Sequence, residues 1–296
     1  LFGSEAAARI GFLLLAVYPN AIGYIPLALT EVFYSTLLLI LAYLFVTGRR
    51  TGLWLLLTAL VFGFTTLVKP QTLVLLPAFF AIDWLRKGNV WQRLPVMIGR
   101  GALTLALASV VIAPWAMRNR DELGSWVAVS TNGGFNLLIG NNDEATGGYG
   151  EDTRAFTAMM NQTGLNEVEA DAKAKRQGLE WISANPLSFV ALAPKKLALL
   201  WLPDGEAEWA YQAGVASYEK HQILFRTVRI VNQAFYGLLM LGFAAAFAWI
   251  ILERRAAGQR WVDWWVLPWV VATYTSMIAV MIFGLSRFHF PVMPYV

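Results

Sequence analysis

Long runs of apolar residues determine what this chain can fold into. A helix needs about 20 mostly apolar residues to cross the roughly 30 Å hydrocarbon core of a bilayer. Seven stretches of the 296-residue sequence meet or approach this length, and we therefore predict an all-α integral membrane protein with about seven transmembrane helices. These stretches lie at 8–25, 28–47, 52–68, 71–86, 95–117, 223–252 and 262–284.

Two of these stretches are irregular. Pro19 and Pro26 interrupt the first, which predicts a kinked or broken span. The fourth is short, and a re-entrant segment is the alternative to a full crossing.

The composition excludes several other classes of protein. Hydrophobic residues make up 57% of the chain and charged residues 14%, which excludes a soluble domain and a disordered chain. The basic residues stand in short clusters between apolar runs, so the net charge of +4 does not predict nucleic-acid binding. With no cysteine and two histidines, we expect neither a metal site nor a cofactor.

The short loops predict the orientation of the chain in the membrane. Loops at 48–51, 86–100 and 253–260 together hold nine Lys and Arg residues against one acid, Glu253. Since basic short loops face the cytoplasm, alternation of the spans places the long loop at 118–220 outside. We expect the chain to lie in a bacterial inner membrane.

The alternation of the spans divides the chain into three parts. Residues 1–117 carry five spans, and residues 221–296 carry two spans and the start of another. Between them, 118–220 forms an extracytoplasmic loop domain with 14 acidic and nine basic residues. Within this domain we expect an interfacial helix at 187–202, anchored by its two adjacent lysines and by Trp201.

The rest of the loop domain divides into loop and helix. The stretch from Ser130 to Gly150 is rich in Gly and Asn, which predicts turns and irregular loop. Helices are predicted over 152–164 and 166–184. Asn166 followed by Glu169 is a capping-box pattern at the start of the second.

Seven side chains that can carry positive charge stand near the predicted outer ends of the spans: Lys69, Arg118, Arg120, Arg226, Arg229, Arg287 and His289. Of these we select Lys69, Arg118, Arg287 and His289 as candidate phosphate ligands. Arginine offers phosphate a bidentate fork and lysine a point charge, so this set predicts a site for a lipid-linked phosphate. The alternative is that these side chains snorkel to the interface or pair with the acidic loop.

Other polar residues are candidates for contact with substrate. Glu31 is an ionisable residue near the outer start of a span, where it either serves function or complements the helix dipole. Asn132, Asn136, Asn141 and Asn142 lie among glycines and offer donors and acceptors to sugar hydroxyls. The alternative for these asparagines is a set of Asx turns.

An ordered series of short motifs, spread over nearly the whole chain, resembles the family 39 glycosyltransferases of the GT-C membrane type. This group includes the protein O-mannosyltransferases and the lipid A aminoarabinose transferases. The motifs are Tyr18-Pro19, Leu29-Thr30-Glu31, Thr65 to Pro70, Asn132 to Asn142, Trp181 to Pro186, Lys195 to Trp201, and Arg287 to Pro291 with Met293-Pro294.

The resemblance implies a polyprenyl-phosphate-linked sugar donor and transfer on the extracytoplasmic side. The acceptor would be a glycan, a lipid or a protein. In that family, the acidic residues thought to act as the base lie in a loop after the first span, and nothing here matches that loop. We therefore expect the chain to be a piece of a longer protein, whose catalytic base lies upstream.

Other functions remain open from the sequence. A transporter or flippase of a lipid-linked sugar also needs cations for phosphate, but it needs no large outer domain and usually has inverted repeats. A polysaccharide polymerase or O-antigen ligase shares the long outer loop, and a structural membrane subunit is a further alternative.

Overall fold

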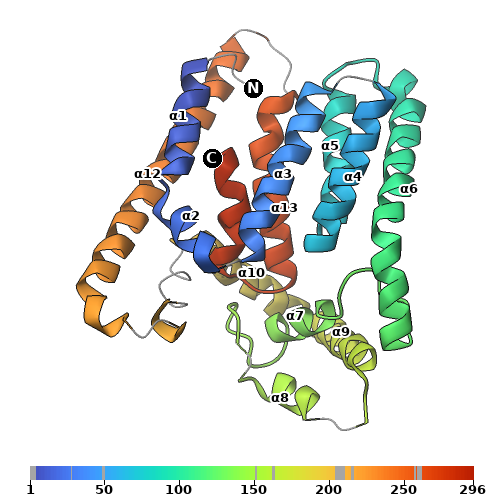
Figure 1. The fold of residues 1–296 in the computed structure, drawn as a ribbon, viewed down its shortest axis with the longest axis vertical. Helices are drawn as coiled ribbons and strands as arrows, with labels where there is room; N and C mark the ends of the chain where they lie inside the picture. Colours follow the sequence, from blue (N-terminus) through green and yellow to red (C-terminus); the bar gives the residue numbers. More distant parts are fainter. Residues whose placement is uncertain are drawn as a thin grey trace.

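The structure is a computed structural model, and the part of it described here is helical with no strand, which confirms the all-α prediction. Its helices form a bundle with a smaller group of helices at one end (Figure 1). The described residues are 5–27, 29–48, 51–150, 152–161, 164–203, 211–214, 217–256, 258 and 262–296.

Four helical segments of the described chain are long and apolar enough to cross a membrane. They are α3 (Thr30–Thr47), α6 (Val90–Leu123), and two segments that open with a short 3-10 helix. The third joins η2 (Glu219–His221) to α12 (Gln222–Ala256), and the fourth joins η3 (Trp264–Val266) to α13 (Leu267–Met281).

The first predicted span is broken. It consists of α1 (Glu5–Ala16), α2 (Pro19–Tyr24) and the 3-10 helix η1 (Ile25–Leu27), with a bend of 48° between the two parts. Pro19 stands in the first turn of α2, where its missing N–H costs nothing, and it cannot continue the helix before it. Counted as one span, this pair raises the number of candidates to five.

The predicted count of seven spans is not reached because two apolar helices are short. The helix α4 (Gly52–Val68) has 17 residues and α5 (Thr72–Leu85) has 14, with Pro77 inside it. At 1.5 Å per residue these helices are about 26 Å and 21 Å long, less than the roughly 30 Å of a hydrocarbon core.

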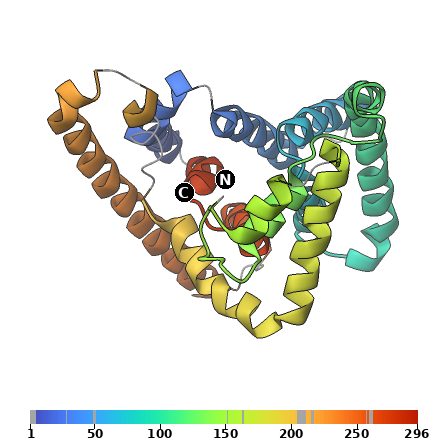
Figure 2. The same ribbon diagram turned by 90° about the horizontal axis from the view of Figure 1, so that it is seen from below.

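The core of the bundle joins α3, α4, α5 and α13. Tyr34, Phe62, Phe79 and Val271 are buried together there and pack against η4 (Ser286–Tyr295), the 3-10 helix near the end of the chain. Figure 2 shows α13 and η4 in the centre, with α1, α2 and α12 on one side of them and α3 to α6 on the other. The segment η4 therefore links the two sides of the bundle.

The helices alternate in direction, so the bundle has two different ends. The connections from α3 to α4, from α5 to α6 and from α12 to α13 lie at one end, and the smaller group of helices lies at the other (Figure 1). The first end is the one that carries the basic loops of the sequence. Of the basic residues there, Arg49, Arg50 and Arg260 lie outside the described residues.

The smaller group contains four helices of the predicted loop domain. Asn166 and Glu169 form the predicted capping box, because each side chain accepts a hydrogen bond from the backbone N–H of the other. The predicted helix at 187–202 is also present and continues through its proline. The four helices are α7 (Gly133–Gly140), α8 (Arg154–Met160), α9 (Glu167–Ala184) and α10 (Pro186–Trp201).

The prediction of loop from Ser130 to Gly150 is wrong over α7. Glycine is a poor helix former, and here it is needed for packing rather than for a turn. A Cβ on Gly134 would lie 1.9 Å from the carbonyl oxygen of Asp171, and one on Gly140 would lie 1.5 Å from that of Ile282. The helix is thus pressed against α9 and against the chain that follows α13. At its start, Asp171 accepts hydrogen bonds from the backbone N–H groups of Gly134 and Phe135.

Alanine substitutions within α7 test this close packing. Gly140→Ala sets a methyl group against the backbone of Ile282. We therefore expect the free energy of unfolding to fall by about 1–3 kcal/mol or more, measured as a lower Tm in detergent. Gly133→Ala in the same helix meets no atom within 4 Å and should leave Tm unchanged or slightly raised. Equal Tm values for the two variants would contradict the proposed packing.

Candidate functional site

Three of the predicted site residues meet at the end of the bundle next to the loop domain. The Glu31 carboxylate in the first turn of α3 is buried. Lys69 Nζ donates a hydrogen bond to Glu31 Oε1 at 3.0 Å, and Arg287 Nε forms an ion pair with the same oxygen at 3.4 Å. We call Glu31, Lys69 and Arg287 the charged cluster. Its members come from three segments far apart in the sequence.

Local sequence places each member of the cluster. Thr30 begins α3, and its hydroxyl donates to Glu31 Oε2 at 3.2 Å. Pro70 disfavours helical conformation at the residue before it, so α4 ends at Val68 and Lys69 adopts an extended conformation. A carboxylate at a helix start and a cation just beyond a helix end are both favoured by the helix dipoles.

Aromatic rings enclose the two cations. Lys69 Nζ lies 5.7 Å from the ring centre of Tyr34 and 5.3 Å from that of Phe288, and the Arg287 guanidinium lies 6.0 Å from Phe288. These distances allow cation–π attraction. Aromatic surroundings also exclude water, which strengthens the attraction between the charges of the cluster.

The cluster carries more positive than negative charge. Two cations face one carboxylate, and in the described part of the chain Glu31 is the only carboxylate paired with Arg287. The side chain of Glu31 is 4% exposed, that of Lys69 14% and that of Arg287 32%. The excess positive charge therefore reaches solvent mainly at Arg287.

The structure does not bring Arg118 or His289 into the cluster. Arg118 is exposed near the end of α6, and its contacts are with Asn119 and the ring of Trp115. His289 is fully buried, and its Nδ1 lies 2.6 Å from the carbonyl oxygen of Leu200 in α10. The histidine thus attaches η4 to the loop domain.

Two of the predicted substrate asparagines have structural contacts. Asn141 Nδ2 donates to the carbonyl oxygens of Leu137 and Met281, at 2.7 and 2.8 Å. Asn142 Nδ2 donates to two carbonyl oxygens in the last turn of α7, and its Oδ1 accepts from the N–H of Glu144. The contact of Asn142 with the N–H of Glu144 is an Asx turn, which was the alternative in the sequence analysis, whereas Asn141 joins α7 to the end of α13.

The other two asparagines lie at the start of α7. Asn132 is the N-cap residue of the helix and is exposed, and its Oδ1 accepts a hydrogen bond from the Ser130 hydroxyl at 3.0 Å. Asn136 follows one turn later and is half-buried. Neither residue contacts the charged cluster among the described contacts.

A polar cavity of about 600 Å³ lies between α7, α8 and α9. Its wall includes Asn142, the ion pair of Glu144 with Arg154, and Trp181, whose Nε1 donates to Asp143 at 2.8 Å. Hydrogen bonds from Arg154 lower the pKa of Glu144, so this carboxylate is ionised at neutral pH. The cavity offers charged groups, amides and one fixed indole to a hydrophilic ligand.

Lys196 is the residue that the sequence interpretation placed wrongly. It was expected to anchor α10 at the membrane interface, but its side chain is fully buried, while Lys195 is exposed. Lys196 Nζ donates to Asn141 Oδ1 at 2.9 Å and to the carbonyl oxygen of Val280 at 3.0 Å. Burial lowers the pKa of Lys196 to about 8. The sequence alone does not show which of the two adjacent lysines, Lys195 or Lys196, is buried.

Two further observations bear on identity. No family model, curated protein sequence or solved structure matches the chain. Among the described residues, no three His, Asp or Glu side chains are grouped as a metal site would require.

Substitution of Lys196 should change how stability depends on pH. The folded-state pKa of about 8 lies below the ordinary 10.5, so the unfolded chain holds this proton more tightly than the folded chain. The effect of Lys196 ionisation on the free energy of unfolding is therefore constant below pH 8. Between pH 8 and 10.5 the free energy of unfolding rises, by about 3 kcal/mol in total.

The measurement is Tm in detergent from about pH 7 to about pH 10. The wild-type curve should rise relative to that of Lys196→Met across the upper part of this range. Lys195→Met, which removes an exposed amine from the neighbouring position, should run parallel to wild type. Parallel curves for all three proteins would show that Lys196 titrates normally.

Proposed function

We propose that this chain forms part of a membrane glycosyltransferase that moves a sugar from a polyprenyl-phosphate donor to an acceptor outside the cytoplasm. The observation that carries the proposal is the convergence of Glu31, Lys69 and Arg287 from three segments at one end of an apolar bundle. The reaction class comes from the motif resemblance, which includes the sequence around each of these three residues.

In this proposal Lys69 and Arg287 hold the phosphate of the donor. The acceptor hydroxyl oxygen attacks the sugar carbon, the bond from that carbon to the phosphate oxygen breaks, and its electron pair stays on the phosphate. Negative charge therefore grows on the leaving group, and fixed cations next to it lower the barrier. The excess of one positive charge in the cluster suits a donor phosphodiester with one negative charge.

Glu31 has a positioning role in the proposed site. Its Oε1 is already engaged by both cations, so we do not assign it the proton of the acceptor hydroxyl. A carboxylate between Lys69 and Arg287 keeps the two cations a few ångströms apart against their mutual repulsion. We assign none of the described residues as the base that takes the acceptor proton.

The polar cavity of the loop domain supports a hydrophilic acceptor. Hydroxyl groups of a glycan can accept from Arg154 and donate to Asp143 or Glu144, and sugar rings pack against indole faces such as that of Trp181. A glycan, a lipid headgroup or a protein loop can each supply such groups.

A flippase or transporter of a lipid-linked sugar is the second candidate, and a polymerase or O-antigen ligase is the third. A flippase would use the same cations for phosphate without breaking a bond. Release of polyprenyl phosphate from the sugar-linked donor separates the transferases from the flippase. The elaborated loop domain, with a cavity of its own, favours an enzyme.

The proposal also assigns the two ends of the bundle to the two sides of a bacterial inner membrane. The end with the basic loops is cytoplasmic, and the charged cluster and residues 118–220 are extracytoplasmic. The short helices α4 and α5 then count as sixth and seventh crossings, because they pack side by side with α3 and α6. Their length is compatible with a locally thinned bilayer.

Single cysteines test this orientation, because the chain has none of its own. Ser130→Cys and Thr51→Cys both replace exposed residues. Thr51 is the N-cap of α4, and Ser130 lies between the end of α6 and α7, which are at opposite ends of the bundle. On intact cells, a membrane-impermeant thiol reagent should label the first and not the second, and permeabilised cells should show both. The reverse pattern would overturn the orientation and the site assigned to it.

Binding of polyprenyl phosphate to the purified chain tests the phosphate role. Lys69→Ala and Arg287→Ala should each weaken binding by roughly 10- to 100-fold, since a charge-assisted hydrogen bond contributes about 1.5–3 kcal/mol. Arg118→Ala should change binding little, because Arg118 lies apart from the cluster. The measurement is a saturation isotherm in detergent with a labelled polyprenyl phosphate.

Polyprenol of the same length is the matched ligand control, because it keeps the tail and lacks the phosphate. We expect it to bind weakly to the wild type and to be insensitive to both substitutions. Equal affinity for the two lipids, or near-wild-type binding in both cluster variants, would remove the basis for the phosphate role.

A further inference from the structure

We propose a binding site for an anionic phospholipid headgroup at the basic end of the bundle, formed by Arg93 and Arg100 of α6. It lies at the opposite end from the charged cluster and does not depend on the proposed transferase activity. Three observations support it: the pairing of the neighbouring charges, the position of the two arginines, and the apolar side chains that line the smaller of their two cavities.

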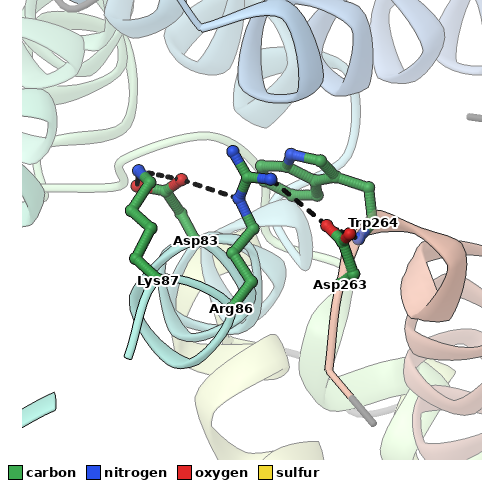
Figure 3. Close-up of polar contacts among 5 residues, drawn as sticks. All are labelled: Asp83, Arg86, Lys87, Asp263 and Trp264. Carbon is green, nitrogen blue, oxygen red and sulfur yellow. Dashed lines mark hydrogen bonds and ion pairs between the residues drawn. The ribbon is translucent and has the colours of Figure 1, made fainter. Parts of the chain in front are cut away.

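Asp83, which lines both cavities beside these arginines, and Asp263 are already paired with other cations. Figure 3 shows Arg86 between Asp83 and Asp263, with Lys87 on the other side of Asp83. Arg86 Nε lies 3.3 Å from Asp83, Arg86 Nη1 lies 3.2 Å from Asp263, and its guanidinium lies 5.1 Å from the ring of Trp264. This network fastens the end of α5 to the start of the η3–α13 segment.

Arg93 and Arg100 lie beside this network but form none of its ion pairs. Neither side chain has an ion pair, hydrogen bond or aromatic contact within the described residues, although both are half-buried. Together with Arg86 and Lys87 they make four cations against two acids. Two positive charges thus have no counter-ion there, and a half-buried charge without one is costly.

The two arginines line adjoining cavities on one face of α6. They are seven residues apart, which is close to two helical turns, so they project in the same direction. One cavity, of about 170 Å³, is lined by Arg93 and Arg100, and the other, of about 290 Å³, also includes Arg100. Both cavities share Asp83 and Lys87. The smaller lies between α5 and α6, and the larger extends to the ends of α3 and α4.

The surroundings are those of a lipid rather than of a soluble anion. Phe80, Val96 and Met97 line the smaller cavity between the charges, and Val96 is 59% exposed on the outer face of α6. Trp91, near the start of α6, is 78% exposed, as expected of an aromatic residue at the membrane–water boundary. A phosphate here would meet arginines while its acyl chains covered the exposed apolar face. Basic pockets between membrane helices are known to take anionic headgroups.

Lipid binding by the purified chain tests this site. Native mass spectrometry with phosphatidylglycerol and with phosphatidylcholine of identical acyl chains measures the preference for the anionic headgroup. We expect the wild type to prefer phosphatidylglycerol by about 10-fold or more. The double variant Arg93→Gln with Arg100→Gln should lower affinity for phosphatidylglycerol by about 10- to 30-fold and leave phosphatidylcholine unaffected.

The same helix supplies the control. Arg118→Gln with Arg120→Gln removes the same charge from the other end of α6 and should keep the wild-type preference. Lys69→Ala should also keep it, which separates this site from the charged cluster. Arg93→Lys with Arg100→Lys retains the charge and should retain most of the affinity for phosphatidylglycerol. The Tm of the glutamine variant is the control for folding, because a misfolded variant would show a lower Tm as well as a lower affinity.

Three outcomes would overturn the proposal. The first is a wild type with no preference between the two lipids. The second is an equal loss in the Arg93/Arg100 and Arg118/Arg120 glutamine variants, which would indicate a general effect of charge. The third is displacement of phosphatidylglycerol by millimolar inorganic phosphate, which would make this a site for a free anion.

Discussion

The buried carboxylate of Glu31 is the constraint on which one end of the bundle depends. A carboxylate at the end of an apolar helix is tolerated when cations neutralise it, because an unpaired buried charge is far more costly than a paired one. Lys69 and Arg287 supply these cations from α4 and η4. The pairing therefore fixes the start of α3 relative to the end of α4 and to η4, and it leaves one positive charge in excess at the surface.

Close backbone packing attaches the loop domain to the same end. Gly140 and Gly284 allow α7 and α10 to approach the chain around 282–284, where any side chain would collide with a carbonyl group. Lys196 Nζ then crosses this contact to Asn141 Oδ1 and to a carbonyl oxygen of α13. Its low pKa reflects how fully the contact excludes water. The domain is thus held by buried backbone and polar contacts, in addition to its links along the chain.

The sequence predicted features that follow from local pattern. The all-helical fold, the break at Pro19 and the capping box at Asn166 each depend on neighbouring residues, and each was found. Features set by distant contacts were missed, because α7 is helical through packing of its glycines and Lys196 is buried by α13. For the candidate site, we chose four cationic residues because they lie near span ends in the sequence. The sequence could not show that two of them, Lys69 and Arg287, contact Glu31.

The contacts of η4 hold in place the backbone that carries Arg287. Two residues after Arg287, His289 is fully buried, with Nδ1 on the carbonyl oxygen of Leu200 and its ring stacked on Trp201 at 5.8 Å. Phe290, next in the chain, packs against Tyr18 and Tyr24 on the other side of the bundle. The backbone that follows Arg287 is therefore anchored both to α10 and to the start of the bundle at Tyr18 and Tyr24. A cation fixed in this way does not have to reorganise when charge develops beside it, which is the condition for electrostatic stabilisation of a leaving group.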